Sequence, residues 1–385
     1  MKTKFICLFV AVIASFFAFG LKSNTAVKAD ELSDAVRDQV DNLDLSDAET
    51  FFNGLNGENI DFLSVFGKIL KGEFDGADNF FDYLKNLLFS DFRAMLPIFS
   101  GVIAAVLLCE ILRNSKSTYL SSNVHTVVKL VSLLTATLIL ATEFVSIWQI
   151  TQNVINNISK FSEIMSPVIL TLMIASGGTA SAAIYKPSVM FFTDTVIIVF
   201  RVAVLPIIGI FTVFNVLSHF NGEIKLKKFA DFFGSVLKWI FGITVVVYGF
   251  LITVQGLSVS TVDGVSAKIA KYAVSNSVPI VGGMLKDGLD VIAAGSVIIK
   301  NAFGIAGVIC VFYFLLAPVA RMVIFSLLLK LSAAVIDVCS DGTTSDFLQT
   351  LSKSVSYFIA AVLTVGLMAF LTVLLMVFSA NAAVL

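Results

Sequence analysis

Long apolar runs dominate this chain, and six of them are long enough to cross a bilayer. They cover residues 94–112, 124–148, 189–217, 232–257, 302–329 and 355–377. A bilayer core requires about 20 helical residues, and every backbone polar group inside it must be hydrogen-bonded internally. The pattern therefore predicts an all-α polytopic membrane protein with about six transmembrane helices. The composition agrees, since 57% of the residues are hydrophobic.

The N-terminus has a different pattern. Lys2 and Lys4 precede an apolar stretch at 5–21, and Val27-Lys28-Ala29 offers a cleavage site. We expect a signal peptide at 1–29, with an uncleaved first membrane helix as the alternative. Residues 30–92 then carry fifteen acidic and four basic side chains. They predict an acidic extracytoplasmic leader, 30–93, of short amphipathic helices, the third at 78–89.

Basic residues in the connections predict the orientation. Arg113 and Lys116 lie between the first two runs, and Lys227 and Lys228 lie between the third and fourth. Such connections stay in the cytoplasm, which places the leader outside. Residues 166–219 must then cross the membrane an odd number of times, and three crossings would leave no room for turns. We therefore expect one crossing in this stretch and a re-entrant or interfacial segment at 167–183. Two membrane helices at 94–148 would thus precede the remainder.

That remainder shows signs of an internal repeat, with units at 149–257 and 258–385. Pro167 and Pro206 match Pro279 and Pro318 at an offset of 112 residues. Repeats of this kind are common in membrane transport folds. The paired prolines at 206 and 318 can form hinges or be structural. Small residues at 175, 178 and 182 would share one helix face, and we expect Gly178 there to serve packing or a hinge.

Charged residues inside the apolar runs are the candidate functional positions: Lys129, Glu143, Asp194, Arg201 and Arg321. Such residues usually face the bundle interior or a water-filled cavity. They predict either ion pairs between helices or a polar pathway. We expect no catalytic, metal or cofactor site, because the chain has no phosphate-binding glycine loop and no His-Glu-x-x-His motif.

One stretch carries a family resemblance. Its distinctive residues are Gln255, Gly256, Asp263, Gly264, Lys268, Lys271, Tyr272, Pro279, Gly282 and Gly283. The stretch resembles the stage III sporulation protein AE family of endospore-forming bacteria. The resemblance implies a membrane core subunit of the channel or secretion-like complex that joins mother cell and forespore after engulfment, lying in the mother-cell membrane around the forespore.

The implied partners are membrane lipid and other proteins of the same operon, including a cytoplasmic secretion-type ATPase and ring-forming proteins. The stage II sporulation protein Q complex is a further implied partner, and no nucleic acid is expected. Two alternatives stay open from the residues alone. One is an autonomous secondary transporter for a small solute, which the duplicated pattern also suits. The other is a purely structural membrane scaffold.

Overall fold

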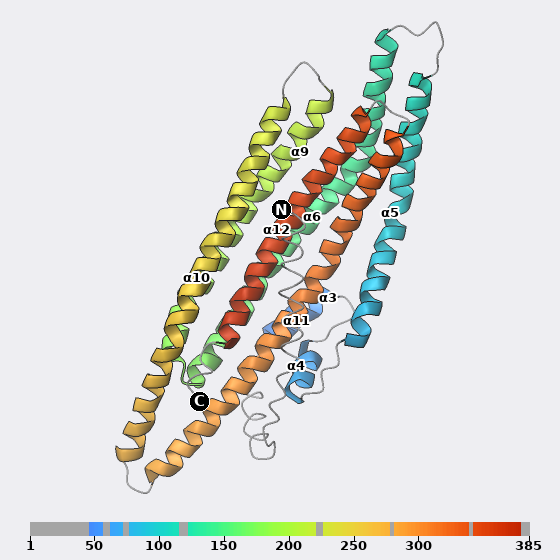
Figure 1. Ribbon diagram of the computed structural model, residues 1–385. Helices are drawn as coiled ribbons and strands as arrows, with labels where there is room; N and C mark the ends of the chain where they lie inside the picture. Colours follow the sequence, from blue (N-terminus) through green and yellow to red (C-terminus); the bar gives the residue numbers. More distant parts are fainter. Residues whose placement is uncertain are drawn as a thin grey trace.

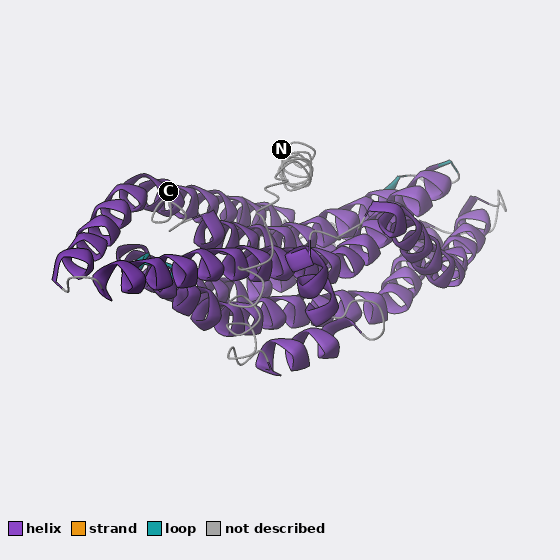
Figure 2. Ribbon diagram, turned by 90° about the horizontal axis from the view of Figure 1, so that it is seen from below, coloured by secondary structure: helices purple, strands orange, loops and turns teal. Residues whose placement is uncertain are grey.

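A computed structural model describes residues 46–56, 62–71, 77–114, 122–220, 226–277, 281–338 and 342–378 (Figure 1). The elements in these ranges are helices, seen as an elongated bundle from below in Figure 2. In chain order they are α3 (Ser46–Asn56), α4 (Phe62–Lys71), α5 (Ala77–Asn114), α6 (Ser122–Ala175), α7 (Thr179–Met190), η1 (Phe191–Val196), α8 (Ile197–Val199), η2 (Phe200–Val204), α9 (Leu205–Phe220), α10 (Leu226–Ser277), α11 (Val281–Asp337) and α12 (Thr343–Phe378). The predicted signal peptide and Pro279 lie outside the described residues.

The all-α polytopic prediction is confirmed. Within the described residues, six helical segments are long and apolar enough to cross a membrane, and each overlaps one predicted crossing. They are Leu84–Ile111, Thr126–Ala175, Ile197–Phe220, Leu226–Leu251, Ile292–Asp337 and Thr343–Leu375.

Several helices continue well past the apolar runs that predicted them. The 38-residue α5 joins the third leader helix to the first crossing without a break, so no structural boundary falls at residue 93. Helices α6, α10 and α11 contain 54, 52 and 57 residues. At 1.5 Å per residue they are about 80 Å long, against about 30 Å for the hydrocarbon core. Much of their length must therefore lie outside the bilayer.

The segment 167–183 differs from its prediction in detail. Pro167 lies inside α6 instead of starting a new helix. The helix ends instead at a tight turn, where Gly177 has a φ of 88°. The Gly177 N–H donates to Ile174 O at 3.0 Å, and the Gly178 N–H donates to Met173 O at 2.9 Å. This pair of bonds is the Schellman motif, in which glycine supplies the left-handed residue.

The small residues at 175, 178 and 182 consequently do not share one helix face. Ala175 is the last residue of α6, and Gly178 lies in the turn that precedes α7. The Ala182 N–H donates to Gly178 O at 3.0 Å, so Gly178 caps the first turn of α7. Its role is to reverse the chain, which the spacing pattern did not reveal.

Pro206 follows a local change in helix type. It is the second residue of α9, directly after the π-helical η2. Proline cannot donate an N–H, and its ring crowds the carbonyl four residues earlier. In η2 the Leu205 N–H bonds to Phe200 O, five residues back, and this wider turn accompanies the proline. Pro318, its predicted counterpart, lies inside the α-helical α11.

The repeat stays a prediction. A similar order of elements occurs twice. Helix α6 is followed by the helical segments α7–α9, and the long helix α10 is followed by the long helix α11. Pro167 lies inside α6, and its predicted counterpart Pro279 lies outside the described residues.

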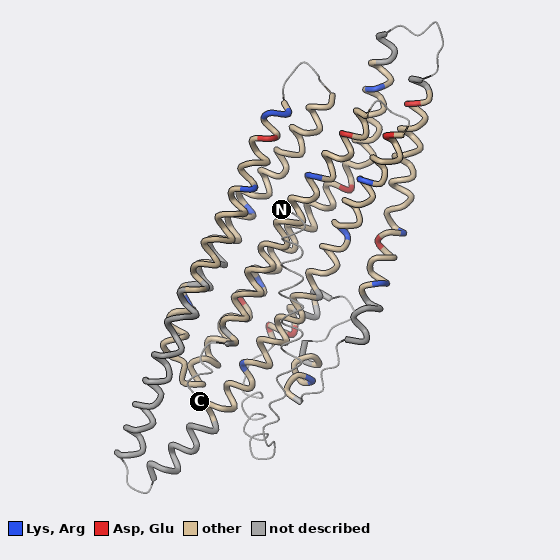
Figure 3. The backbone as a smooth tube through the Cα atoms, in the orientation of Figure 1, with Lys and Arg blue, Asp and Glu red and all other residues tan. Residues whose placement is uncertain are grey.

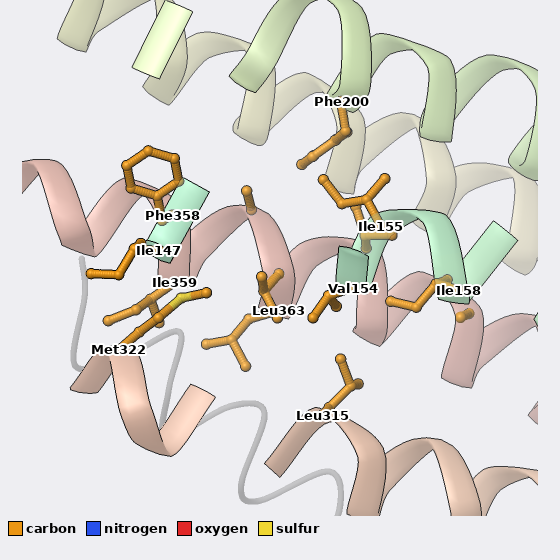
Figure 4. Packing of buried hydrophobic residues seen from close by; sticks show 14 of the residues in the cluster. Ile147, Val154, Ile155, Ile158, Phe200, Leu315, Met322, Phe358, Ile359 and Leu363 are labelled. Carbon is orange, nitrogen blue, oxygen red and sulfur yellow. The ribbon is translucent and has the colours of Figure 1, made fainter. Parts of the chain in front are cut away.

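Helix α12 is the centre of the bundle and packs on α11, α6 and α9. Figure 4 shows its Phe358, Ile359 and Leu363 among side chains of α6 and α11. Two tyrosines tie α10 to α12 as well. Tyr357 OH donates to Gly234 O at 3.3 Å, and Tyr248 OH donates to Met368 O at 3.1 Å. Satisfied polar groups of this kind are what a membrane interior requires.

Close helix crossings depend on glycine. A side-chain carbon at Gly304 of α11 would overlap the Val377 Cγ2 methyl of α12, and one at Gly366 would lie 2.5 Å from Leu315 Cδ1. Small residues allow this approach of backbones in membrane bundles. Because α11 is continuous through Gly304 and Gly307, these glycines serve packing instead of breaking the helix.

Candidate functional site

Two of the five predicted intramembrane charges form an ion pair between helices. The Nη2 of Arg321, in α11, lies 3.7 Å from Oε2 of Glu143, in α6. The same nitrogen donates to Ser146 Oγ at 3.5 Å. Glu143 and Ser146 are three residues apart, so they lie on one face of α6. Charged residues are sparse along these helices (Figure 3), which makes an interhelical pair a notable feature.

Asp91 of α5 is a further ionisable side chain near this pair, since the charge of Arg321 acts on its carboxyl group. We call Asp91, Glu143, Ser146 and Arg321 the Arg321 cluster. It combines two carboxyl groups with one guanidinium and joins three membrane helices. Asp91 was expected to belong to the leader. The continuous α5 places it inside the span Leu84–Ile111.

An aromatic group holds the three helices together beside this cluster. Phe325, one turn beyond Arg321 in α11, is buried. Its ring centroid lies 5.3 Å from that of Phe99 in α5 and 5.6 Å from that of Phe144 in α6. Both contacts are edge-to-face, the arrangement that aromatic pairs favour. The rings fix the helix register that brings the charges together.

The two charged side chains of the ion pair are partly buried. The Arg321 side chain is 40% exposed and that of Glu143 16%. The guanidinium thus reaches the surface of the single chain, whereas the carboxylate is more enclosed. Chemically the cluster can fix the alignment of α5, α6 and α11, and it can also present charge to a neighbouring molecule at membrane depth.

Two further buried charges escaped the sequence analysis. Glu110 of α5 is 1% exposed, and Thr344 Oγ1 donates to its Oε1 at 3.4 Å. Thr344 is the second residue of α12, so the carboxylate lies near the partial positive charge of a helix N-terminus. Lys300 of α11 is 0% exposed. It lies just before the apolar run that began at 302, and it belongs to the span Ile292–Asp337.

The remaining predicted charges are not in the Arg321 cluster. Lys129 is half-buried in α6. Arg201 does not face the interior of its own chain, because the adjacent Phe200 is fully buried against Phe241 and the helix turns Arg201 outward. Arg201 makes no ion pair with those side chains that the structure describes, and that of Asp194 is not among them. The backbone of Asp194 belongs to η1, and its side chain lies outside the description.

The distinctive family-like residues lie at the junction of α10 and α11. Seven of them belong to α10, and Gly282 and Gly283 lie in the first turn of α11. Their backbone is helical, while their side chains lie outside the described part of the chain.

The comparison with known proteins agrees with this arrangement. The family described as stage III sporulation protein AE matches residues 60–380. The chain belongs to this family. The match includes all six membrane-crossing segments and every member of the Arg321 cluster. The resemblance inferred from the sequence is thereby confirmed, and with it a role in sporulation for a multi-pass membrane protein.

A curated member of the stage III sporulation protein AE family also aligns with the chain. Stage III sporulation protein AE of Bacillus subtilis (strain 168) is 25% identical over 334 residues, which is 83% of this chain and 84% of the relative. No solved structure matches.

Proposed function

We propose that this family member is a membrane core subunit, without enzymatic activity of its own, of the channel or secretion-like complex that joins mother cell and forespore after engulfment. The observation that supports this most is the extent of the family match. Residues 60–380 take in every helix from α4 to α12, and so all six membrane-crossing segments. The shared feature is thus the membrane body itself and not an attached soluble module.

The proposed orientation follows from charge. Helices α5, α9 and α11 end, and α6, α10 and α12 begin, at one end of the bundle (Figure 1). Basic side chains mark this end: Arg113 near the end of α5, and Lys227 and Lys228 at the start of α10. An excess of basic residues is typical of cytoplasmic connections, which supports the proposal that this end lies in the mother-cell cytoplasm. The leader and the long reversals would then face the space between the two membranes.

The long helices suit such a position. Helix α10 continues from Leu257, where the apolar run of the sequence ends, to Ser277, and α11 starts at Val281. At 1.5 Å per residue this extension is about 30 Å long. A projection of that length offers contacts to ring-forming proteins between the membranes, while the opposite end would meet a cytoplasmic ATPase. Proteins of the same operon and the stage II sporulation protein Q complex are the proposed partners.

The bundle also suits a subunit that works in an assembly. Its polar side chains contact one another between helices, as in the Glu143–Arg321 ion pair and the Glu110–Thr344 hydrogen bond. Each contact joins two helices that are far apart in the sequence, so each stabilises the packing of the bundle. The Arg321 guanidinium is at the same time exposed enough to meet a neighbour.

Deletion of the gene in its host tests the proposal. We expect development to stop after engulfment, with a fluorescent fusion of the full chain located around the forespore. The full chain supplied from a second locus should restore spores. Normal spores in the deletion strain, or a fusion spread over vegetative membranes, would refute the proposal. Solute uptake by the purified chain alone in vesicles would favour a secondary transporter instead.

A further inference from the structure

We infer that the interior of the bundle binds one monovalent metal cation, such as Na⁺, between α5, α6, α11 and α12. The proposed ligands are side-chain oxygens of Glu110, Ser132, Ser332 and Thr344. The inference goes beyond the proposed function and does not depend on what the complex carries. It rests on two buried hydroxyl groups, on the register of the four helices and on the chemistry of the oxygens that they bring together.

Two buried serine hydroxyls are the observation that points to a ligand. Ser132 of α6 is 0% exposed, and Ser332 of α11 is 1% exposed. Neither Oγ atom has a hydrogen-bond partner among the described residues. Other hydroxyls in these helices bond to a backbone carbonyl, as Thr137 does to Leu133 O at 2.7 Å. A buried hydroxyl without a partner is costly, so two such groups in one region indicate that a bound water or ion completes their contacts.

The register of α6 against α11 places the two serines opposite each other. The two helices run in opposite directions (Figure 1), and Arg321 of α11 contacts Glu143 of α6. Ser332 lies eleven residues after Arg321, and Ser132 lies eleven residues before Glu143. Eleven residues make about three helical turns, so each serine is on the same face of its helix as the charged residue. The two hydroxyls therefore face the same interhelical space at similar height.

Glu110 and Thr344 lie at the same height. Thr344 Oγ1 donates to Glu110 Oε1 at 3.4 Å, which joins α12 to α5. The 2.8 Å hydrogen bond between Ser326 and Ser352 sets the register of α12 against α11. Ser332 lies six residues after Ser326, and α11 and α12 run in opposite directions. Thr344 lies eight residues before Ser352, so its height differs from that of Ser332 by two residues, about 3 Å.

All four side chains are enclosed by protein. Glu110 and Thr344 are each 1% exposed, as Ser332 is. Glu110 continues the buried face of α5 that includes Val106 and Phe99, and the Phe99 ring contacts α11. Helix α11 packs on α5, α6 and α12. The oxygens of four helices thus converge on one interior region, near the end of the bundle where α5 and α11 end and α12 begins (Figure 1).

The donor set suits a monovalent cation. Carboxylate and hydroxyl oxygens are ligands that hard cations prefer. Among the described residues, no group of three His, Cys, Asp or Glu side chains could hold a metal ion, which argues against a divalent or transition-metal site in this region. The Glu110 carboxylate balances one positive charge, and the three hydroxyls add ligands without adding charge. Such balance matters because an uncompensated charge is costly in an interior of low dielectric constant.

Thermal unfolding of the purified full chain in mixed micelles tests the site. Tryptophan fluorescence follows unfolding in NaCl and in choline chloride at the same total concentration, since choline is too large for an enclosed site. A ligand that binds only the folded state stabilises it, and we expect the midpoint temperature to be about 2–4 °C higher in NaCl. Glu110→Gln keeps an oxygen for Thr344 but removes the charge, and it should abolish this difference.

Serine substitutions distinguish cation binding from packing. Ser132→Ala and Ser332→Ala each remove one proposed ligand with little change in volume, and each should reduce the difference between the two salts at least twofold. Ser326→Ala is the matched control, because Ser326 is a buried serine of α11 that bonds to Ser352 instead. It should lower the midpoint temperature in both salts and leave their difference unchanged. The serine variants also provide the test if Glu110→Gln does not fold.

Three results would overturn the inference. Equal midpoint temperatures of the unsubstituted chain in the two salts would show that no cation binds, and a buried water would then be the partner of the serines. A salt difference that persists in Glu110→Gln and Ser332→Ala would place the cation elsewhere. Loss of the difference in Ser326→Ala would show that it reports general packing. Failure of the proposed function is separate, since spore formation is not a readout of this experiment.

Discussion

Removal of Arg321 should destabilise the bundle more than removal of Glu143, its nearest partner. At the 3.7 Å separation of the two charges, an effective dielectric constant of 20 gives a gross attraction of about 4.5 kcal/mol. Desolvation offsets much of this, and interhelical polar contacts in membrane proteins contribute about 0.6 kcal/mol on average and about 1.7 at most. We therefore expect a coupling energy of about 1–1.5 kcal/mol between Glu143 and Arg321.

The single substitutions should differ because Glu143 is more enclosed than Arg321. Arg321→Leu leaves the enclosed Glu143 carboxylate without its cation, and we expect it to lower the free energy of unfolding by about 1–3 kcal/mol. Glu143→Leu leaves the more exposed Arg321 guanidinium beside Ser146 and within reach of water, so its cost should be about half as large. The double variant should cost less than the sum of the two, by the coupling energy.

Trp148 offers a probe for this measurement. Its ring contacts Phe358 at a centroid distance of 6.0 Å and would touch a side chain at Gly209. With Trp239→Phe as background, its fluorescence follows unfolding of the purified chain in mixed micelles as denaturing detergent is added. Lys160→Leu is the control for loss of an exposed cation from α6. Strictly additive single and double variants would refute the reasoning, as would a larger loss from Glu143→Leu than from Arg321→Leu.

Two further predictions use the same assay. Gly304→Ala should destabilise the chain by about 1–3 kcal/mol, because the new methyl overlaps Val377 Cγ2. Adding Val377→Ala should recover most of this loss of stability. Gly242→Ala is the control and should have little effect, because the space around Gly242 is open. Equal costs at Gly304 and Gly242 would contradict the packing. Glu110→Leu should lower the free energy of unfolding by about 1–3 kcal/mol, because the Thr344 hydroxyl loses its hydrogen-bond acceptor. Glu110→Gln should lower it less. A larger loss from Glu110→Gln than from Glu110→Leu would contradict the assigned hydrogen bond.

The membrane helices could be predicted from sequence because hydrophobic length alone identifies them. The runs at 302–329 and 355–377 became parts of α11 and α12, and their existence needed no knowledge of packing. Their ends were harder to predict. The second crossing was expected to end at residue 148, yet α6 continues to Ala175. Helix propensity continues where hydropathy falls, so apolar runs mark the membrane and not the helix.

The contacts within the Arg321 cluster could not be predicted from the hydropathy pattern. Arg321 and Glu143 were both recognised as unusual, but their pairing depends on the register of α11 against α6, which Phe325 and Phe144 fix. Asp91 was missed because an acidic leader was expected to end at residue 93. Lys300 and Glu110 were missed because each lies near the edge of an apolar run, where a polar residue normally reaches water. Their burial follows from neighbouring helices far away in sequence.

Arg201 was recognised in the sequence, but the side of the helix on which it lies could not be predicted. Its position inside an apolar run predicted a polar environment, and the single chain leaves it exposed. Sequence can locate a charge along a helix, but the face it occupies depends on which neighbours bury the adjacent residues. Here Phe200 takes the interior position.

The proposed role of this membrane subunit is to support the forespore after engulfment. The most direct measurement is a reporter of late forespore gene expression in cells depleted of the full chain once engulfment is complete. We expect the reporter to fail to rise in engulfed forespores, and re-supply of the chain to restore it. A reporter that rises as in undepleted cells would refute the proposed role.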